Sequence, residues 1–181
     1  MDMTRGKLVT GLQRLVIAFG AAVGLVLVSG RKANAEELGL LDRAHPGSAG
    51  WIPPPAASPY RALVDRAELR EGIPSMLLLS LLMQESAFLP EIIHGGPNPR
   101  GAVGIAQIVK RWHPSSNPTD PIHSINYAAA LLKRHRVRFG TWDKALAAYN
   151  WGPTVLAQEG YQRRPAETRD YVRRINARVY A

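Results

Sequence analysis

The sequence predicts a mainly α-helical domain, compact and built from several helices with at most a small β-hairpin. Three observations support this. Apolar residues recur at helical spacing in several segments after residue 59, glycines and prolines separate these segments, and no segment shows the sustained apolar–polar alternation that marks a strand. The 181 residues are 46% hydrophobic and 20% charged, which is the composition of one globular domain with a tail.

The first 35 residues have the features of an export signal. Basic residues precede a run of apolar residues and glycines at 15–28, which is too short for a membrane-spanning helix of roughly 20 residues. The small-x-small sequence at 33–35 suits a signal peptidase, so we expect cleavage after residue 35 and a mature protein in the periplasm or at the cell wall. Arg31 and Lys32 favour the alternative, an uncleaved membrane anchor.

The composition narrows the classes of partner and cofactor. The formal net charge of +9 points to nucleic acid, a membrane surface or an acidic cell-wall polymer. Removing residues 1–35 takes away five basic residues and one acid, and the remaining net charge of +5 argues against nucleic acid. The absence of cysteine excludes disulfides, a thiol nucleophile and a thiolate metal site, and the five histidines show no pair at ligand spacing. We therefore expect no metal and no cofactor.

Residues 36–58 are predicted to be a linker that precedes the folded domain at residues 59–181. Prolines and glycines are frequent there, and the three prolines at 53–55 favour an extended, semi-rigid spacer. We expect neither a helix nor a strand in this segment.

The folded domain is expected to begin with a helix that ends at Gly72. One face of this helix is apolar, and charged residues including Glu68 are placed on the opposite, solvent-facing side; the apolar residues are Tyr60, Leu63, Val64 and Ala67, and the charged ones are Arg61, Asp65, Arg66 and Glu68. A second helix starts near Pro74. Its segment 76–83 is almost wholly apolar, which predicts burial on all sides.

The middle of the domain is expected to be irregular. Residues 88–103 contain many prolines and glycines and have room for a short hairpin. A short helix is expected to follow Gly104 and to end before Pro114.

Three helices are expected to complete the domain. Asp120 and Pro121 supply a cap and first turn for a helix that runs to about residue 138 and ends at Gly140. A short helix follows and is terminated by Gly152-Pro153. The apolar positions of the short helix are Trp142, Leu146 and Tyr149, and those of the last helix are Thr168, Tyr171, Val172, Ile175 and Val179.

Glu85 lies at the end of the apolar second helix. It follows Leu78, Leu81 and Leu82 by seven, four and three residues, so its neighbours on that helix face are aliphatic. A carboxyl in such surroundings loses the solvation of its anion, which raises its pKa and lets it act as a general acid near neutral pH. The alternative is a glutamate at a helix end that simply reaches water.

Four sequence blocks occur in order and resemble the catalytic domain of the soluble lytic transglycosylases. The blocks are LLMQESAF at 81–88, GAVGIAQI at 101–108, AAYNWGP at 147–153, and Tyr171 in the last helix. The resemblance covers about residues 60 to 180. It implies the goose-type lysozyme fold, an α+β lysozyme-like arrangement, and peptidoglycan glycan strands as the partner.

The resemblance implies a role for each matching residue. Glu85 matches the single catalytic acid/base, Ser86 the serine that supports the site by hydrogen bonding, and Tyr171 the tyrosine whose hydroxyl lies near the catalytic carboxyl. Without the resemblance, Tyr171 reads equally well as a core residue.

The same comparison places four residues at the sugar-binding cleft. Gly104 and Gln107 match the Gly-x-x-Gln block that lines it, and Tyr149 and Asn150 match the Tyr-Asn pair that shapes it. Taken alone, Gly104 is a helix start, Gln107 a surface amide, Tyr149 a core residue and Asn150 part of a turn.

The motifs contain one acid, so the resemblance implies a substrate-assisted reaction. Glu85 would protonate the β-1,4 bond between N-acetylmuramic acid and N-acetylglucosamine, and then deprotonate the C6 hydroxyl to close a 1,6-anhydro ring, without water, metal or cofactor. We expect a monomeric, exported enzyme that remodels the wall or opens it for a secretion or conjugation apparatus. The alternatives are a hydrolytic muramidase of the same fold and a non-catalytic peptidoglycan-binding assembly protein.

Some positions depart from the family pattern. Ala106 replaces a frequent methionine, and Trp151 replaces the usual small residue between Asn150 and Gly152. These changes bear on which sugars the cleft prefers. Arginines away from the apolar stripe of the last helix, among them Arg174, are interpreted as a solvated face in preference to a wall-binding site.

Overall fold

A computed structural model of the chain describes residues 50–180 and, for the backbone alone, residues 27–28 and 31–32. The chain divides into two units, Met1–Ala44 and His45–Ala181. In the first unit, β1 (Leu27–Val28) pairs antiparallel with β2 (Arg31–Lys32). The rest of the predicted signal segment and the linker up to residue 49 lie outside the described residues.

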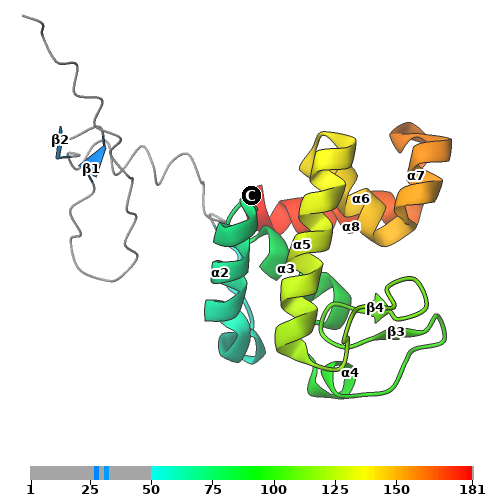
Figure 1. Cartoon of the computed structure of the whole chain (residues 1–181), viewed down its shortest axis with the longest axis horizontal. Coiled ribbons are helices and arrows are strands. Elements are labelled where there is room, and N and C mark those ends of the chain that lie inside the picture. The colour runs from blue at the N-terminus through cyan, green and yellow to red at the C-terminus, as the bar shows by residue number, and fades with distance from the viewer. Residues whose placement is uncertain (1–26, 29–30, 33–49, 181) are drawn as a thin grey trace, which may run out of the picture. The chain divides into compact units, whose positions relative to one another are not determined.

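The second unit is mainly helical, with one small hairpin among its described residues (Figure 1). In the hairpin, Ala102 lies opposite Val109, and Val103 lies opposite Ile108. The elements in chain order are η1 (Pro55–Tyr60), α2 (Arg61–Glu71), α3 (Leu77–Ser86), α4 (Pro90–Ile93), β3 (Ala102–Val103), β4 (Ile108–Val109), α5 (Pro121–Phe139), α6 (Trp142–Trp151), α7 (Pro153–Glu159), η2 (Tyr161–Arg163) and α8 (Ala166–Tyr180). The predicted fold class is confirmed.

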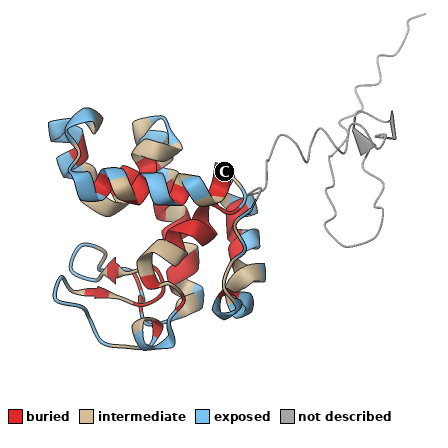
Figure 2. Ribbon diagram, turned by 180° about the vertical axis from the view of Figure 1, so that it is seen from behind, coloured by how far each residue is buried: buried red, intermediate tan, exposed pale blue. Residues whose placement is uncertain are grey.

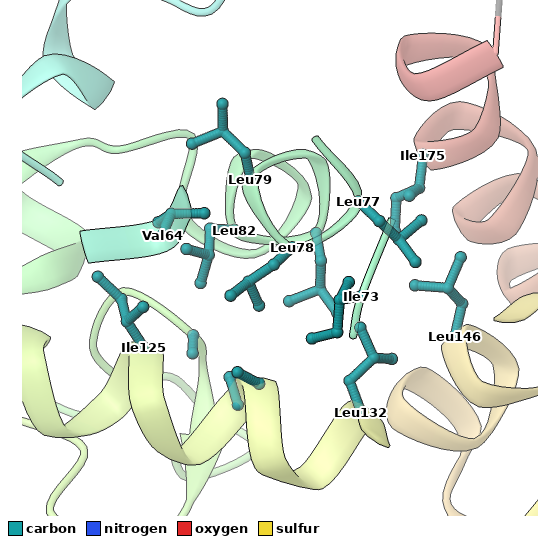
Figure 3. Close-up of a cluster of buried hydrophobic side chains, with 14 of the residues drawn as sticks. Val64, Ile73, Leu77, Leu78, Leu79, Leu82, Ile125, Leu132, Leu146 and Ile175 are labelled. Carbon is teal, nitrogen blue, oxygen red and sulfur yellow. The ribbon is translucent and has the colours of Figure 1, made fainter. Parts of the chain in front are cut away.

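Helix α3 forms the centre of the core. Its residues 77–82 are all fully buried, as their apolar run predicts. Figure 3 shows the four leucines 77, 78, 79 and 82 among residues of α2, α5, α6 and α8, such as Val64, Leu132 and Ile175. Figure 2 shows the same arrangement as buried stripes along the helices that surround α3. Enclosure on all sides fixes the direction of α3, and therefore the position of Glu85 near its C-terminal end.

The predicted solvent exposure of Glu68 is wrong. Its side chain is only 3% exposed, and its two carboxyl oxygens accept hydrogen bonds from the backbone N–H groups of Met76, Leu78 and Leu79 at 2.8 to 3.3 Å. These N–H groups belong to the start of α3, where a helix has no internal acceptors for them. A residue of α2 therefore caps α3. Helical periodicity alone does not reveal this, because the contact joins two helices.

The predicted helix after Gly104 is also wrong, since residues 104–107 form the turn of the β3–β4 hairpin. Both Gly104 (φ +77°) and Gln107 (φ +46°) have left-handed backbone conformations, which interrupt a right-handed helix. A Cβ atom on Gly104 would lie 1.9 Å from the carbonyl oxygen of Pro118, so the close approach of that backbone requires glycine. The irregular segment 88–103 also contains the short helix α4.

Several predicted helix ends are confirmed. The Asp120 side chain accepts hydrogen bonds from the N–H groups of Ile122 and His123 at the start of α5, and Gly140 ends that helix in a left-handed conformation. Gly152 ends α6 as expected, but Pro153 then begins α7, since proline is well tolerated in the first turn of a helix.

The structure differs from the predicted linker at its C-terminal end. Residues 55–60 form the 3₁₀-helix η1, and Ala57 in it is 1% exposed within the core. Within the part of the chain that the structure describes, no helix combines the length and apolar character needed to cross a membrane.

Candidate active site

A cleft of about 450 Å³ lies where α3, α6 and α8 meet the hairpin. Helix α3 contributes Gln84 and Glu85, and α6 contributes Tyr149 and Asn150. A third wall is α8, which contributes Glu167, Asp170, Tyr171 and Arg174. The fourth wall is the hairpin together with the loop before it, and it contributes Asn98, Arg100, Ala102, Gln107 and Val109. Five of the seven predicted site residues line this cleft, namely Glu85, Gln107, Tyr149, Asn150 and Tyr171. Ser86 and Gly104 do not.

The Glu85 carboxyl is held by Tyr171, which lies 86 positions later in the chain. The Tyr171 hydroxyl donates a hydrogen bond to Glu85 Oε1 at 2.5 Å. Loss of solvation raises the pKa of Glu85 to about 7, and the hydrogen bond from Tyr171 partly opposes that rise by favouring the anion. Burial and the nearby Glu85 raise the pKa of Tyr171 well above its ordinary value, so Tyr171 keeps its proton and remains a donor.

Near neutral pH, Glu85 therefore exists in both protonation states. A group with this property can give a proton in one step and accept one in the next. On α3, Leu78, Leu81 and Leu82, which precede Glu85 by seven, four and three residues, are fully buried. The opposite side of Glu85 faces a cleft lined mainly by polar side chains.

Ser86 lies behind the cleft wall. It is 1% exposed, its hydroxyl donates to the Leu82 carbonyl at 3.2 Å, and it accepts from the Phe88 N–H at 3.3 Å. Ala87 and Phe88 have left-handed backbone conformations just after α3 ends. Ser86 does not line the cleft, and its hydrogen bonds hold the backbone turn that follows Glu85.

Gln107 reaches the cleft from the hairpin turn. Its amide nitrogen donates to the Gly104 carbonyl at 2.9 Å, and its amide oxygen accepts from Asn98 Nδ2 at 3.1 Å. Asn98 also accepts from the backbone N–H groups of Arg100 and Ala102, so it organises the loop before β3. Gly104 itself is buried outside the cleft wall and allows the turn that presents Gln107.

Tyr149 and Asn150 tie α6 to the other walls. The Tyr149 hydroxyl donates to the Ala106 carbonyl at 2.8 Å, which joins α6 to the hairpin. Burial raises the pKa of Tyr149 well above its ordinary value, with a further contribution from Glu85. Asn150 Oδ1 accepts from the Thr168 hydroxyl at 2.8 Å, which joins α6 to α8. Among residues 50–180 we find no hydrogen bond from Asn150 Nδ2.

Sequence reasoning did not assign Asn98, Arg100, Glu167, Asp170 or Arg174 to the site. The three residues of α8 had a detectable signal, because positions 167, 170, 171 and 174 follow helical spacing around Tyr171. Asn98 and Arg100 lie in a loop, for which periodicity predicts nothing.

A second cavity of about 450 Å³ lies beside α5, α6 and α7. Phe139, Leu156 and Tyr161 contribute to its lining, and none of the predicted site residues reaches it. In residues 50–180 no three histidine or acidic side chains gather closely enough to hold a metal ion.

One family of known proteins matches most of this domain. The model of the transglycosylase SLT domain matches residues 62–172, more than half of the chain, and this range includes all four sequence blocks. The family consists of lytic transglycosylases that act on peptidoglycan, which supports a peptidoglycan-directed function of that general type. The chain belongs to the transglycosylase SLT domain family.

Proposed function

We propose that this protein is an exported lytic transglycosylase that cleaves the β-1,4 bond between N-acetylmuramic acid and N-acetylglucosamine. Glu85 is its only acid/base, and the products carry 1,6-anhydro-muramic ends. The observation that supports this best is the Glu85 carboxyl, with a pKa of about 7, held by Tyr171 in a cleft that also presents the amides of Gln107 and Asn150.

In the first step, protonated Glu85 gives its proton to the glycosidic oxygen. The bond between that oxygen and the anomeric carbon breaks, and N-acetylglucosamine leaves with a hydroxyl. The acetamido oxygen of the muramic acid attacks the anomeric carbon and stabilises the positive charge that develops there. The Tyr171 hydroxyl stabilises the carboxylate that Glu85 becomes, since its hydrogen bond favours the anion.

In the second step, the Glu85 carboxylate takes the proton of the muramyl C6 hydroxyl. The C6 oxygen bonds to the anomeric carbon and displaces the acetamido oxygen, which closes the anhydro ring. Glu85 is then protonated again, so no water is consumed. A pKa near 7 serves both steps, because near neutral pH the group is available as the acid for the first transfer and as the base for the second.

The other carboxylates of the cleft also support a reaction with a single acid. Glu167 lies 3.4 Å from Arg100, and Asp170 lies 2.9 Å from Arg173. A glycosidase with two catalytic carboxyls needs a second one placed across the glycosidic bond. The Glu167 and Asp170 side chains are 66% and 46% exposed, so neither is a buried acid like Glu85, and we assign neither a catalytic role.

The test is mass spectrometry of digested peptidoglycan. Anhydro-muropeptides, lighter than the hydrolytic products by the mass of one water, about 18 Da, are the expected result, whereas reducing ends would identify a hydrolytic muramidase. Glu85→Gln should abolish lysis while wall binding is kept, and Asp170→Asn should retain the anhydro products. Glu91→Gln, an exposed carboxyl on α4, is the matched control. Absence of lysis by the wild-type protein would favour a non-catalytic binding role.

Export and cellular role form the remaining part of the proposal. The basic, apolar and small-residue pattern of residues 1–35 supports export. One small catalytic domain suits local opening of the wall for a secretion or conjugation apparatus, or wall remodelling. N-terminal sequencing of the exported protein should begin at Glu36, and a chain that begins at Met1 would indicate a retained anchor.

A further inference from the structure

Four charged side chains line the cleft in addition to Glu85. Arg100 comes from the loop before β3, and Glu167, Asp170 and Arg174 come from one face of α8. The same α8 face carries Tyr171, which contacts the catalytic carboxyl. Charges therefore lie on two walls of the cleft, and those on α8 lie within about one helical turn of Tyr171.

These charges are not fully neutralised within the protein. Arg100 and Glu167 form a 3.4 Å ion pair between the loop and α8, but their side chains are 80% and 66% exposed. Such an exposed pair contributes little to stability, so a ligand can replace one partner at small cost. Asp170 pairs with Arg173, which leaves Arg174 without an ion pair among the residues that the structure describes.

The glycan backbone of the proposed substrate does not account for these charges. N-acetyl sugars present amides and hydroxyls, which match Gln107, Tyr149 and Asn150. The charged part of peptidoglycan is the stem peptide, with its carboxylates. It is attached through the lactyl group on C3 of the same muramic ring whose C1 reacts, so it begins within one sugar ring of the bond that is cut.

We infer, on the basis of the proposed function, that Arg174 binds a carboxylate of the stem peptide, and that Arg100 leaves its ion pair with Glu167 to bind a carboxylate of the same peptide. Planar guanidinium groups bind carboxylates with two parallel hydrogen bonds, which a lysine does not reproduce. The cleft then recognises the charge of the stem peptide in addition to the sugars. The enzyme prefers strands with ionised stem peptides over strands whose peptides are neutral.

The experiment compares two substrates that differ only in charge. Soluble glycan strands with intact stem peptides are used directly, or after their peptide carboxylates have been converted to amides with carbodiimide and ammonium chloride. The wild-type full chain should show a kcat/KM about tenfold higher on the charged strands, as expected for a charge-assisted hydrogen bond. The preference should weaken as salt is raised.

Variants test whether Arg174 causes the preference for charged strands. Arg174→Gln should lower kcat/KM about tenfold on charged strands and leave it unchanged on amidated strands, and Arg174→Lys should keep part of the preference. Arg66→Gln, an exposed arginine on α2 outside the cleft, should change neither value. An equal loss on both substrates, or no loss on either, would overturn the inference.

A binding measurement separates this inference from the proposed reaction. Co-sedimentation with peptidoglycan, before and after amidation, is measured for Glu85→Gln and for the double variant Glu85→Gln/Arg174→Gln. The inference requires Glu85→Gln to bind charged peptidoglycan more tightly than amidated peptidoglycan, and the double variant to show a smaller difference, since Arg100 still binds the peptide. Absence of anhydro products from the wild type would overturn the reaction, but the binding comparison would still decide the role of Arg174.

Discussion

The raised pKa of Glu85 predicts that this carboxyl destabilises the fold at neutral and alkaline pH. The pKa rises from 4.5 in a solvated glutamate to about 7 in the folded protein. The folded state therefore binds the proton more tightly than the unfolded state, and stability is lost as pH rises from 4.5 through 7. One pKa unit corresponds to about 1.4 kcal/mol, so ionisation of Glu85 lowers the free energy of unfolding by about 3 kcal/mol.

Replacing Glu85 with glutamine should remove this cost, because the amide has no charge and its oxygen can still accept the hydrogen bond from Tyr171. We expect Glu85→Gln to be more stable than the wild type by about 3 kcal/mol at pH 8.5 and by only about 1 kcal/mol at pH 5. Urea unfolding followed by tryptophan fluorescence at both pH values measures the difference. Burial also raises the pKa of Glu68 to about 7, but this titration occurs in both proteins and cancels from the comparison.

Glu91→Gln is the control for the general effect of removing a carboxylate. Glu91 is exposed on α4, so its replacement should change stability little and by a similar amount at both pH values. If the stability gain of Glu85→Gln is the same at pH 5 and pH 8.5, or if the variant is less stable at pH 8.5, the reasoning about burial of this carboxyl is refuted.

Three further substitutions test other parts of the structure. Tyr171→Phe removes the hydrogen bond that lowers the pKa of Glu85, so the fall of kcat/KM on the alkaline side should move to higher pH; an unmoved pH profile would contradict the contact. Glu68→Ala leaves the N–H groups at the start of α3 without acceptors and should cost about 3 kcal/mol in urea unfolding, and a loss below about 1 kcal/mol would argue against the cap. Gly104→Ala should lower stability by at least about 2 kcal/mol in thermal unfolding, because its Cβ would meet the Pro118 carbonyl; wild-type stability would disprove that close approach.

The sequence by itself determined the elements whose signals are local. Asp120 and Gly140 mark the ends of α5, because a cap involves only the residues of one helical turn. The apolar stripe of the last helix and the all-round burial of α3 were also predictable, since both follow from the spacing of apolar residues along one helix. The four ordered sequence blocks, taken together, were sufficient to indicate the family that the comparison then showed.

Only the tertiary structure decided which side chains meet. The packing of α2 against α3 decides whether the Glu68 side chain reaches solvent or the start of α3. The spacing of apolar residues in α2 is the same for both outcomes. The turn at 104–107 formed in place of a helix because Gly104 packs against the backbone of Pro118. The 2.5 Å contact between Glu85 and Tyr171 joins residues 86 positions apart and forms because α3 packs against α8; the family resemblance implied that the two groups are close, but helical periodicity did not. The periodicity of one helix does not predict such contacts, because they form when faces of several helices are buried against one another.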